Sequence, residues 1–380
     1  MSKPLHTLRF KLRLKHIPVE FLILFAATSV SVLSLYGSKY WGFANVAGEG
    51  TARLITSVWL ESLLLFCLLC LFVKAFTFCK HTFPDKPLIY VGISFMVFLM
   101  IVNLFLRFSS ILVSSVFASV NGEYAISVSS WYLALDVQMG VYRFLDTCIA
   151  IVLNTPYAVE FFGFFYSNTM IVVAGLVFLF AFHSKKLARE YMFALVIASV
   201  VSTPFWLLLP AIAPVQLATY ESVAVYDTAG VLSGQTAVVM ELFTKYENTN
   251  WAAVVTGWDD FWRQVYDFGW GFPVSCNPSM HIIWGVLVAF YARKIHWFFG
   301  AAGIFFLVAE GVGTMLFLQH YLIDIGFGFI IAALVIVLTQ KLLTFEKRYL
   351  SVNTDAWFSF MDYMEHTGVK ILSLIKGRKQ

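Results

Sequence analysis

Residues 321–341 read YLIDIGFGFIIAALVIVLTQK. From Ile325 to Gln340 this run contains no charged residue. A helix needs about 20 predominantly apolar residues to cross a bilayer, and the run has that length. The run therefore predicts a transmembrane helix.

Seven further apolar runs precede it in the chain. They lie at about 19–36, 55–76, 87–107, 162–182, 191–212, 280–296 and 298–318. The residues are 60% hydrophobic and only 13% charged, which is more apolar surface than a water-soluble domain of ordinary size can bury. We therefore expect an all-α integral membrane fold with about eight transmembrane helices. We interpret the first run as a retained helix, since no small-residue cleavage pattern ends it.

The distribution of basic residues predicts an orientation. If the loops alternate between two faces, 20 of the 26 lysines and arginines fall on one face, together with both termini. By the positive-inside rule that face is cytoplasmic. This asymmetry also explains the net charge of +4, so we expect no nucleic-acid partner.

Two long connections, 108–161 and 213–279, are predicted on the opposite, external face, where function is to be sought. The first connection has polar and aromatic residues at spacings that suit helices lying in the interface, namely Trp131, Tyr132, Asp136, Arg143 and Asp146. The second has four tryptophans among acidic residues, namely Trp251, Trp258, Trp262 and Trp270. We interpret the tryptophans as surface anchors at the membrane boundary, the alternative being that they admit a lipid substrate.

The five cysteines form neither a disulfide framework nor a zinc pattern. Cys67 and Cys70 lie within an apolar helix, where packing is the favoured role. Cys148 and Cys276 are both predicted outside and could pair.

The segment CNPSMH, residues 276–281, opens the run at 280–296 from its external end. Its asparagine is a favoured N-cap, and its proline fits the first helical position. The free N–H groups of Ser279, Met280 and His281 would then point outward with the positive end of the helix dipole, which can hold a phosphate. His281 would lie beside that anion.

The segment HYLID, residues 320–324, opens the last run from the same side. A spacing of four places His320 and Asp324 on one helical face, so the carboxylate can accept a proton from one imidazole nitrogen and leave the other as a nucleophile. Either motif histidine alone is equally consistent with a buried polar cap between helices. The two together favour function, because the other six histidines map to the cytoplasmic side.

The sequence PSMH, followed about forty residues later by HYxxD, resembles the second and third motifs of the type 2 phosphatidic acid phosphatase (PAP2) superfamily, normally PSGH and SRxxxxxHxxxD. The resemblance covers about 162–341. It implies a six-helix core in which His320 attacks phosphorus to give a phosphohistidine, Asp324 orients it and His281 protonates the leaving oxygen. It also implies that no metal and no other cofactor takes part.

At two places where that family has basic residues, this sequence has uncharged ones. The first family motif supplies a lysine and ends in Arg-Pro, whereas residues 206–214 here read WLLLPAIAP, and the arginine of the third motif would fall at Thr314. A phosphomonoester carries up to about two charges and usually needs a cationic clamp, while a phosphodiester carries one. The sequence therefore favours a diester substrate, and the same departures resemble the inositol phosphorylceramide synthase branch.

We expect substrate binding by a set around the two motifs, namely Asn277, Ser279, Met280, Tyr321 and Arg263. Arg263, Arg143 and Lys245 are candidates for the missing phosphate clamp, which would favour a phosphatase. Glu310 in the seventh run is expected to pack against a polar partner, with catalysis as the alternative.

Three regions are expected. Residues 1–86 form a cytoplasmic arm with two additional transmembrane helices, 87–342 form a PAP2-like catalytic membrane domain, and 343–380 form a cytoplasmic amphipathic tail. The predicted function is transfer of a phospho-head group from a phospholipid to a lipid or glycan hydroxyl. The alternatives are a lipid or polyprenyl phosphate phosphatase and, third, a non-enzymatic lipid transporter.

Membrane lipids are thus the expected partners, while the oligomeric state is not predicted. The chain contains no Asn-x-Ser/Thr glycosylation site. This favours a bacterial inner membrane with a periplasmic site, with a Golgi-type membrane and a luminal site as the alternative.

Overall fold

The computed structural model describes residues 19–40, 49–82, 87–119, 122–219, 231–265, 277–350, 361–362 and 365–366. The described chain is helical and contains no strand. The helices are α1 (Val19–Tyr40), α2 (Glu49–Thr82), α3 (Pro87–Ser119), α4 (Gly122–Gln138), α5 (Val141–Leu153), α6 (Ala158–His183), α7 (Lys185–Leu208), α8 (Pro214–Thr219), α10 (Val231–Tyr246), α11 (Asn250–Val265), α12 (Met280–Arg293), α13 (Trp297–Leu316) and α14 (Leu322–Phe345), followed by a π-helical turn (Glu346–Leu350).

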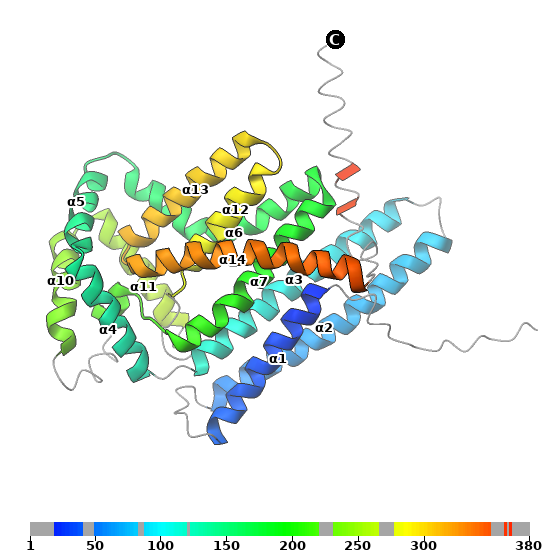
Figure 1. The fold of residues 1–380 in the computed structure, drawn as a ribbon, viewed down its shortest axis with the longest axis horizontal. Helices are drawn as coiled ribbons and strands as arrows, with labels where there is room; N and C mark the ends of the chain where they lie inside the picture. Colours follow the sequence, from blue (N-terminus) through cyan, green and yellow to red (C-terminus); the bar gives the residue numbers. More distant parts are fainter. Residues whose placement is uncertain are drawn as a thin grey trace, which may run out of the picture.

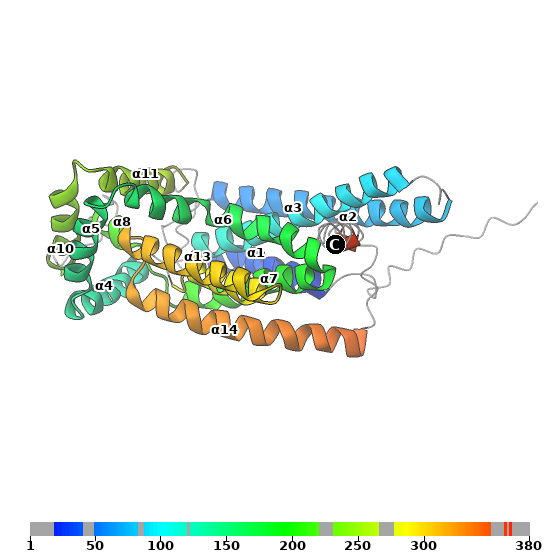
Figure 2. The ribbon, with the colours of Figure 1, turned by 90° about the horizontal axis from the view of Figure 1, so that it is seen from above.

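The long helices form an elongated bundle (Figure 1). In its centre α12 packs against α13 and α14, and α7 packs against α6 and α14. The N-terminal helices α1 and α2 lie against α3 and thereby extend the bundle on one side (Figures 1 and 2).

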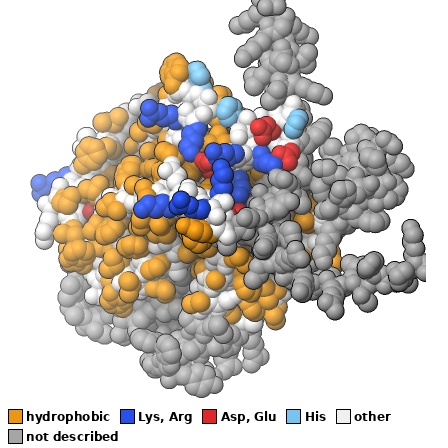
Figure 3. Space-filling model, turned by 45° about the vertical axis from the view of Figure 1, so that its right-hand side comes forward, with side chains coloured by type: hydrophobic (Ala, Val, Ile, Leu, Met, Phe, Trp, Pro, Cys, Tyr) orange, Lys and Arg blue, Asp and Glu red, His pale blue; other side chains and the backbone are white. Residues whose placement is uncertain are grey.

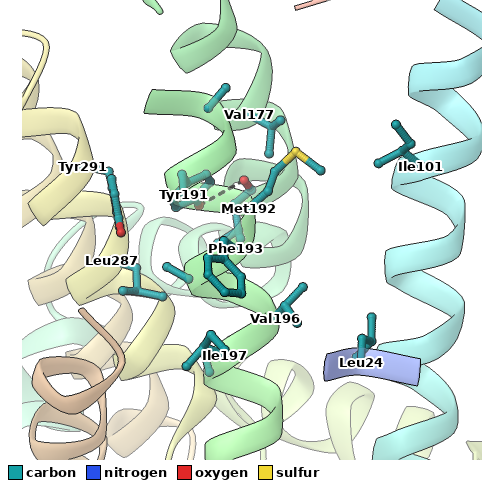
Figure 4. Packing of buried hydrophobic residues seen from close by; sticks show 14 of the residues in the cluster. Leu24, Ile101, Val177, Tyr191, Met192, Phe193, Val196, Ile197, Leu287 and Tyr291 are labelled. Atoms are coloured by element: carbon teal, nitrogen blue, oxygen red, sulfur yellow. Dashed lines mark hydrogen bonds between the residues drawn. The ribbon is translucent and has the colours of Figure 1, made fainter. Parts of the chain in front are cut away.

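Apolar side chains fill the space between these helices. Figure 4 shows Met192 and Val196 of α7 facing Ile101 of α3. Tyr191, on the same turn of α7, is fully buried and donates its hydroxyl to the carbonyl of Val173 at 3.1 Å.

Glycines bring the central helices close together. A Cβ added to Gly303 of α13 would lie 2.6 Å from the Cα of Ala289 in α12. A Cβ added to Gly328 of α14 would lie 2.9 Å from the Cβ of Ile282 in α12. Backbones approach this closely only where small residues line the interface.

Five described segments are long and apolar enough to cross a membrane, and three shorter apolar helices accompany them. The five are Ile55–Val73, Ala158–His183, Lys185–Leu208, Trp297–Leu316 and Leu322–Tyr349, and the shorter ones are Glu20–Val32, Gly92–Leu104 and Met280–Arg293. Each of the eight predicted runs thus falls on an apolar helix. The fold is consistent with an integral membrane protein, and the count of eight crossings stays a prediction.

Both connections predicted as external contain helices of their own. Helix α3 continues to Ser119, and α4 and α5 follow it, whereas α8, α10 and α11 belong to the second connection. Helices α4, α5, α8, α10 and α11 gather at the end of the bundle where α14 begins (Figures 1 and 2). The first connection contains helices, as expected, and their position in the membrane interface stays a prediction. Together with the helices of the second connection they cap one end of the bundle.

The opposite end carries most of the described basic residues. In Figure 3 lysine and arginine side chains gather at this end above a hydrophobic flank. The described basic residues at the ends of α6, α7, α12 and α14 are Lys185, Lys186, Arg189, Arg293, Lys294, Lys341, Lys347 and Arg348. The guanidinium of Arg189 lies 3.0 Å from Glu20 of α1 and 2.6 Å from Glu346 after α14, so one ion-pair cluster joins the first and last described long helices to α7.

Candidate active site

Two histidines converge at the capped end of the bundle. Nε2 of His320 lies 3.4 Å from Nδ1 of His281, and the ring centroids are 5.6 Å apart. The same Nε2 lies 3.3 Å from the hydroxyl of Ser279. The structure therefore brings together three of the residues that the two motifs single out.

Asp324 lies on the other side of the His320 ring. Its carboxylate is 3.5 Å from Nδ1 of His320 and also accepts a hydrogen bond of 3.0 Å from the backbone N–H of Tyr321. The expectation that His320 and Asp324 share a helical face is wrong, because α14 begins at Leu322 and His320 precedes it. The carboxylate reaches back across the helix N-terminus instead.

A tight turn places His320. Only five residues, 317–321, connect α13 to α14, and Leu318 among them has a left-handed backbone with φ of 57°. Non-glycine residues seldom adopt this conformation, which costs about 1–3 kcal/mol and is common near functional sites. The carbonyl of Leu318 accepts a hydrogen bond of 3.1 Å from Val215, and the N–H of Gln319 donates to Thr314 at 3.0 Å.

The second motif folds differently from the sequence expectation. Helix α12 begins at Met280 with Ser279 as N-cap, so Asn277 and Pro278 precede the helix, and the bond between them is cis. The N–H of Ser279, expected to be free for phosphate, donates to the backbone carbonyl of Asp324 at 3.3 Å. The helix N-terminus that can face an anion therefore starts at Met280.

Aromatic rings enclose His281. Its ring stacks on Tyr166 of α6, with centroids 4.7 Å apart and an angle of 22° between the planes. The indole of Trp284, one turn deeper in α12, lies edge-on at 6.0 Å. Met280 accepts a hydrogen bond of 3.4 Å on its sulfur from Ser202 of α7. These contacts fix the first turn of α12 against α6 and α7.

Two residues of α4 contact both motif segments. The side-chain amide of Asn277 donates to the Tyr132 hydroxyl at 2.6 Å, and the N–H of Leu322 donates to the Asp136 carboxylate at 3.2 Å. Burial, and to a lesser extent the nearby carboxylate of Asp324, raises the pKa of Asp136 to about 7. The sequence predicts only that these α4 residues lie on an interfacial helix. Their spacing of four is the one signal that they share a face.

Tyr321 is fully buried, and its ring lies edge-on to Tyr132, with centroids 5.6 Å apart.

The candidates for a cationic clamp on the phosphate differ in whether they already have an acidic partner. Lys245 pairs with Asp146 at 2.7 Å, and the side chain of Arg143 is exposed. The side chain of Arg263 lies outside the described residues. Thr314, where the family pattern has arginine, donates its hydroxyl to Gly311 in its own helix at 2.8 Å.

Trp251 corrects the interpretation of the second external connection. Its indole is fully buried and donates to the carbonyl of Leu316 at 2.8 Å, so it anchors α11 to the end of α13 and not to a membrane surface. The side chains of the other three tryptophans lie outside the described residues, as does Cys276 of the suggested cysteine pair.

Glu310 and Glu61 both have polar partners. Glu310 of α13 is buried and accepts a hydrogen bond of 2.6 Å from Thr169 of α6, in agreement with packing against a polar neighbour. Glu61 of α2 pairs with Arg107 of α3 at 3.2 Å. In the described ranges, no group of three His, Cys, Asp or Glu side chains is placed to hold a metal ion.

Comparison with known proteins gives one match. A family model of the PAP2 superfamily matches residues 133–338, more than half of the 380 residues. This range contains both histidines and the residues that follow Tyr132 in α4. No curated protein and no solved structure matches the chain.

Proposed function

Because the chain belongs to the PAP2 superfamily, whose members are generally phosphatases or phosphotransferases, we propose that it is a membrane phosphotransferase that acts on a lipid phosphodiester. The observation that carries this proposal is the contact between His281 and His320, with Asp324 behind His320. Two imidazoles with one oriented by a carboxylate can supply a nucleophile and a proton donor at the same phosphorus atom.

The first step forms a covalent intermediate. The carboxylate of Asp324 faces Nδ1 of His320 and keeps the proton on that nitrogen, which leaves the lone pair of Nε2 free to attack phosphorus. As the N–P bond forms, the P–O bond to the leaving alcohol, diacylglycerol in a glycerophospholipid, breaks. Protonated His281 gives its proton to that oxygen, so the step ends with a phosphohistidine at His320 and neutral His281.

The second step restores both residues. The hydroxyl of a lipid or glycan acceptor gives its proton to His281 as its oxygen attacks phosphorus, and the N–P bond breaks with its electrons returning to Nε2 of His320. If water takes the place of the acceptor, the same steps are a hydrolysis. Because the two nitrogens are already 3.4 Å apart, a phosphoryl group bound between them requires the rings to separate.

The lack of cations in the motifs supports a diester over a monoester. Residues 206–214 contain no lysine or arginine, and Thr314 supplies no charge. The N-terminus of α12 can balance part of the single charge of a diester, whereas the two charges of a monoester usually need a cationic clamp. This supports the finer proposal of a branch resembling inositol phosphorylceramide synthases.

An apolar cavity supports a substrate with a hydrocarbon chain. It has a volume of about 150 Å³ and lies between α3, α6, α7 and α12, with Met170, Val177, Met192 and Trp284 among its lining residues. Along α6, Met170 and Val177 lie about 6 and 16 Å deeper than the level of Tyr166, which stacks on His281. A chain attached to a head group at the histidines could thus descend into the cavity.

The charge distribution supports a site on the non-cytoplasmic side. Most of the described basic residues lie at the end of the bundle opposite the start of α14 (Figure 3), whereas Arg143 of α5 and Lys245 of α10 lie at the capped end. By the positive-inside rule the basic end faces the cytoplasm. We therefore favour a site on the non-cytoplasmic side. Because the chain has no Asn-x-Ser/Thr glycosylation site, we favour a bacterial inner membrane with the site toward the periplasm, a luminal site in a Golgi-type membrane being the alternative.

The experiment that tests the function uses the purified full chain in nanodiscs. It is given phosphatidylinositol or phosphatidylglycerol labelled on phosphorus, with and without ceramide as acceptor, in a chelator. Labelled phosphatidic acid serves as the monoester. We expect label on the acceptor and acid-labile label on the protein. Release of free phosphate from phosphatidic acid alone would favour the phosphatase, and no turnover of any lipid would favour the transporter.

A further inference from the structure

One face of α4 carries three buried polar side chains. They are Ser129, Tyr132 and Asp136, and their exposed fractions are 0%, 1% and 2%. The spacing of three and then four residues places them in one line along the helix. Buried polar groups are kept in proteins when they are hydrogen-bonded, so the partners of this line indicate its purpose.

Each of the three accepts a hydrogen bond from a different motif segment. The Ser129 hydroxyl accepts from the N–H of Ile212 at 2.7 Å, within the segment 206–214 that stands in place of the first motif. The Tyr132 hydroxyl accepts from Asn277 at 2.6 Å, at the start of the second motif. The Asp136 carboxylate accepts from the N–H of Leu322 at 3.2 Å, in the third motif.

The three bonds act on positions at or beside helix ends. The segment that contains Ile212 lies between α7 and α8, Asn277 precedes α12, and Leu322 is the first residue of α14. The second and third segments are themselves joined by the hydrogen bond from Ser279 to Asp324. A shift of α4 therefore changes the positions of His281 and His320 relative to each other.

We infer that α4 is a latch that holds the three motif segments in register and so sets the distance between His281 and His320. Ser129, Tyr132 and Asp136 are positioning residues, since each contacts a motif segment and none contacts either histidine ring through these bonds. Ser129 and Tyr132 also precede residue 133, where the match to the family model begins. Only the activity readout of this inference rests on the proposed function.

The test compares variants that each remove one hydrogen bond between α4 and a motif segment. Asp136→Ala removes the acceptor of Leu322, and Asp136→Asn keeps an oxygen in the same place. Because small misplacements of a catalytic group can cost about 100-fold in rate, we expect Asp136→Ala to lower kcat by about that factor with little change in KM, and Asp136→Asn to restore it.

Ser129→Ala and Tyr132→Phe each remove one neutral hydrogen bond to a motif segment, and we expect each to lower kcat about tenfold. Ser129→Ala also removes the bond of 2.6 Å from the Ser129 hydroxyl to the carbonyl of Ala125 within α4. The matched control is Ser130→Ala on the same helix, because the Ser130 hydroxyl donates to the carbonyl of Ile126 within α4 at 2.8 Å. This control should leave kcat unchanged.

Hydrogen–deuterium exchange of the resting protein tests the latch without any substrate. In Asp136→Ala we expect faster exchange both in peptides covering 318–325 and in those covering 277–283, with no change at the opposite turn, 293–297. Exchange confined to 318–325, or unchanged kcat in an active protein, overturns the latch. If the wild type turns over no lipid, the proposed function fails, and exchange alone decides on the latch.

Discussion

Nε2 of His320 lies 3.4 Å from Nδ1 of His281, although 39 residues separate the two histidines in the chain. Both residues lie at helix N-termini that meet at one end of the bundle, and the bond from Ser279 to Asp324 joins these termini directly. Because Asp324 also approaches the far side of the His320 ring, the three side chains form a continuous row. Because different roles are proposed for these residues, substitutions at them are expected to have different effects on turnover.

Replacing the nucleophile should abolish turnover. We expect His320→Ala to reduce phosphotransfer below detection and to remove acid-labile label from the protein. Asp324→Asn keeps the size of the side chain but weakens its hold on the Nδ1 proton, and in comparable triads such a change costs about 10⁴-fold in kcat. Label transfer and thermal unfolding in detergent measure both effects.

The control is His296→Ala. His296 is exposed at the N-cap of α13, at the opposite end of that helix from His320, so its loss should leave the rate unchanged. Wild-type rates in His320→Ala would rule out the double-displacement mechanism.

Alanine substitutions at two glycines of α14 give a matched pair of variants that tests the packing of α14 against α12 beside the site. A Cβ at Gly328 would lie 2.9 Å from the Cβ of Ile282 and 3.1 Å from the carbonyl oxygen of Ser279, whereas a Cβ at Gly326 meets nothing within 4 Å. Gly328→Ala must therefore push α14 away from the start of α12, and we expect a loss of kcat of about 100-fold.

Gly326→Ala introduces the same methyl group into open space and, by helix propensity, should stabilise the helix slightly. Parallel kcat and thermal unfolding measurements on the two variants separate the packing effect from the propensity effect. Equal kcat values in the two variants would contradict the view that contact between α12 and α14 sets the histidine geometry.

The apolar cavity predicts a dependence on chain length. Ala174 lines the cavity, and Ile171 lies on the same helix with 70% of its surface exposed. Ala174→Trp should fill the cavity and raise KM for long-chain phospholipids while leaving a short-chain, water-soluble analogue unaffected. Ile171→Trp, the control, should change neither. A uniform loss for both substrates in Ala174→Trp would argue against chain binding there.

The residues around the histidines explain which parts of the site the sequence could predict. PSMH and HYxxD identify the two histidines, because both motifs open apolar runs from the same end. The exact helix starts depend on tertiary contacts. Ser279 caps α12 while its N–H bonds to Asp324, and the left-handed Leu318 delays the start of α14 beyond His320. Neither contact leaves a local sequence signal.

The same reasoning applies to the fold. Apolar runs locate the membrane helices, but α7 begins at Lys185 and not at 191, because its first charged turn is helical and yet does not belong to the apolar run. Trp251 has the composition of an interfacial residue and is buried instead, since its indole N–H finds a carbonyl at the end of α13. Hydrophobic periodicity in the sequence does not show which distant segments contact each other, as α4 contacts the motif segments.

The ion-pair cluster at the basic end predicts a loss of stability without a specific loss of catalysis. Arg189 lies between Glu20 and Glu346, whose side chains are 1% and 4% exposed. Removing one member of a buried pair typically costs about 3–5 kcal/mol, because a charge is left without its partner. We expect Arg189→Ala to lower thermal stability strongly and Lys186→Ala, whose side chain is 86% exposed, to have little effect. Unfolding followed by tryptophan fluorescence measures the difference.

The buried carboxyl of Asp136 predicts a pH dependence of stability. Its pKa is about 7 in the folded protein and about 3.8 in the unfolded chain. Between these two values the folded protein binds the proton more strongly, so the contribution of Asp136 to stability falls as pH rises from about 4 to about 7 and is constant outside this window. Asp136→Asn has no such proton and should lack this decline.

The measurement is the difference in unfolding midpoint between Asp136→Asn and the wild type at several pH values. Other titrating groups act equally in both proteins and cancel, as long as the amide keeps the hydrogen bond from Leu322. We expect the variant to gain stability over the wild type as pH rises through the window from about 4 to about 7, and the gain to level off above it. A difference that stays constant from pH 4 to pH 8 would mean that Asp136 is ionised throughout. Its carboxylate would then bind the start of α14 as a permanent charge.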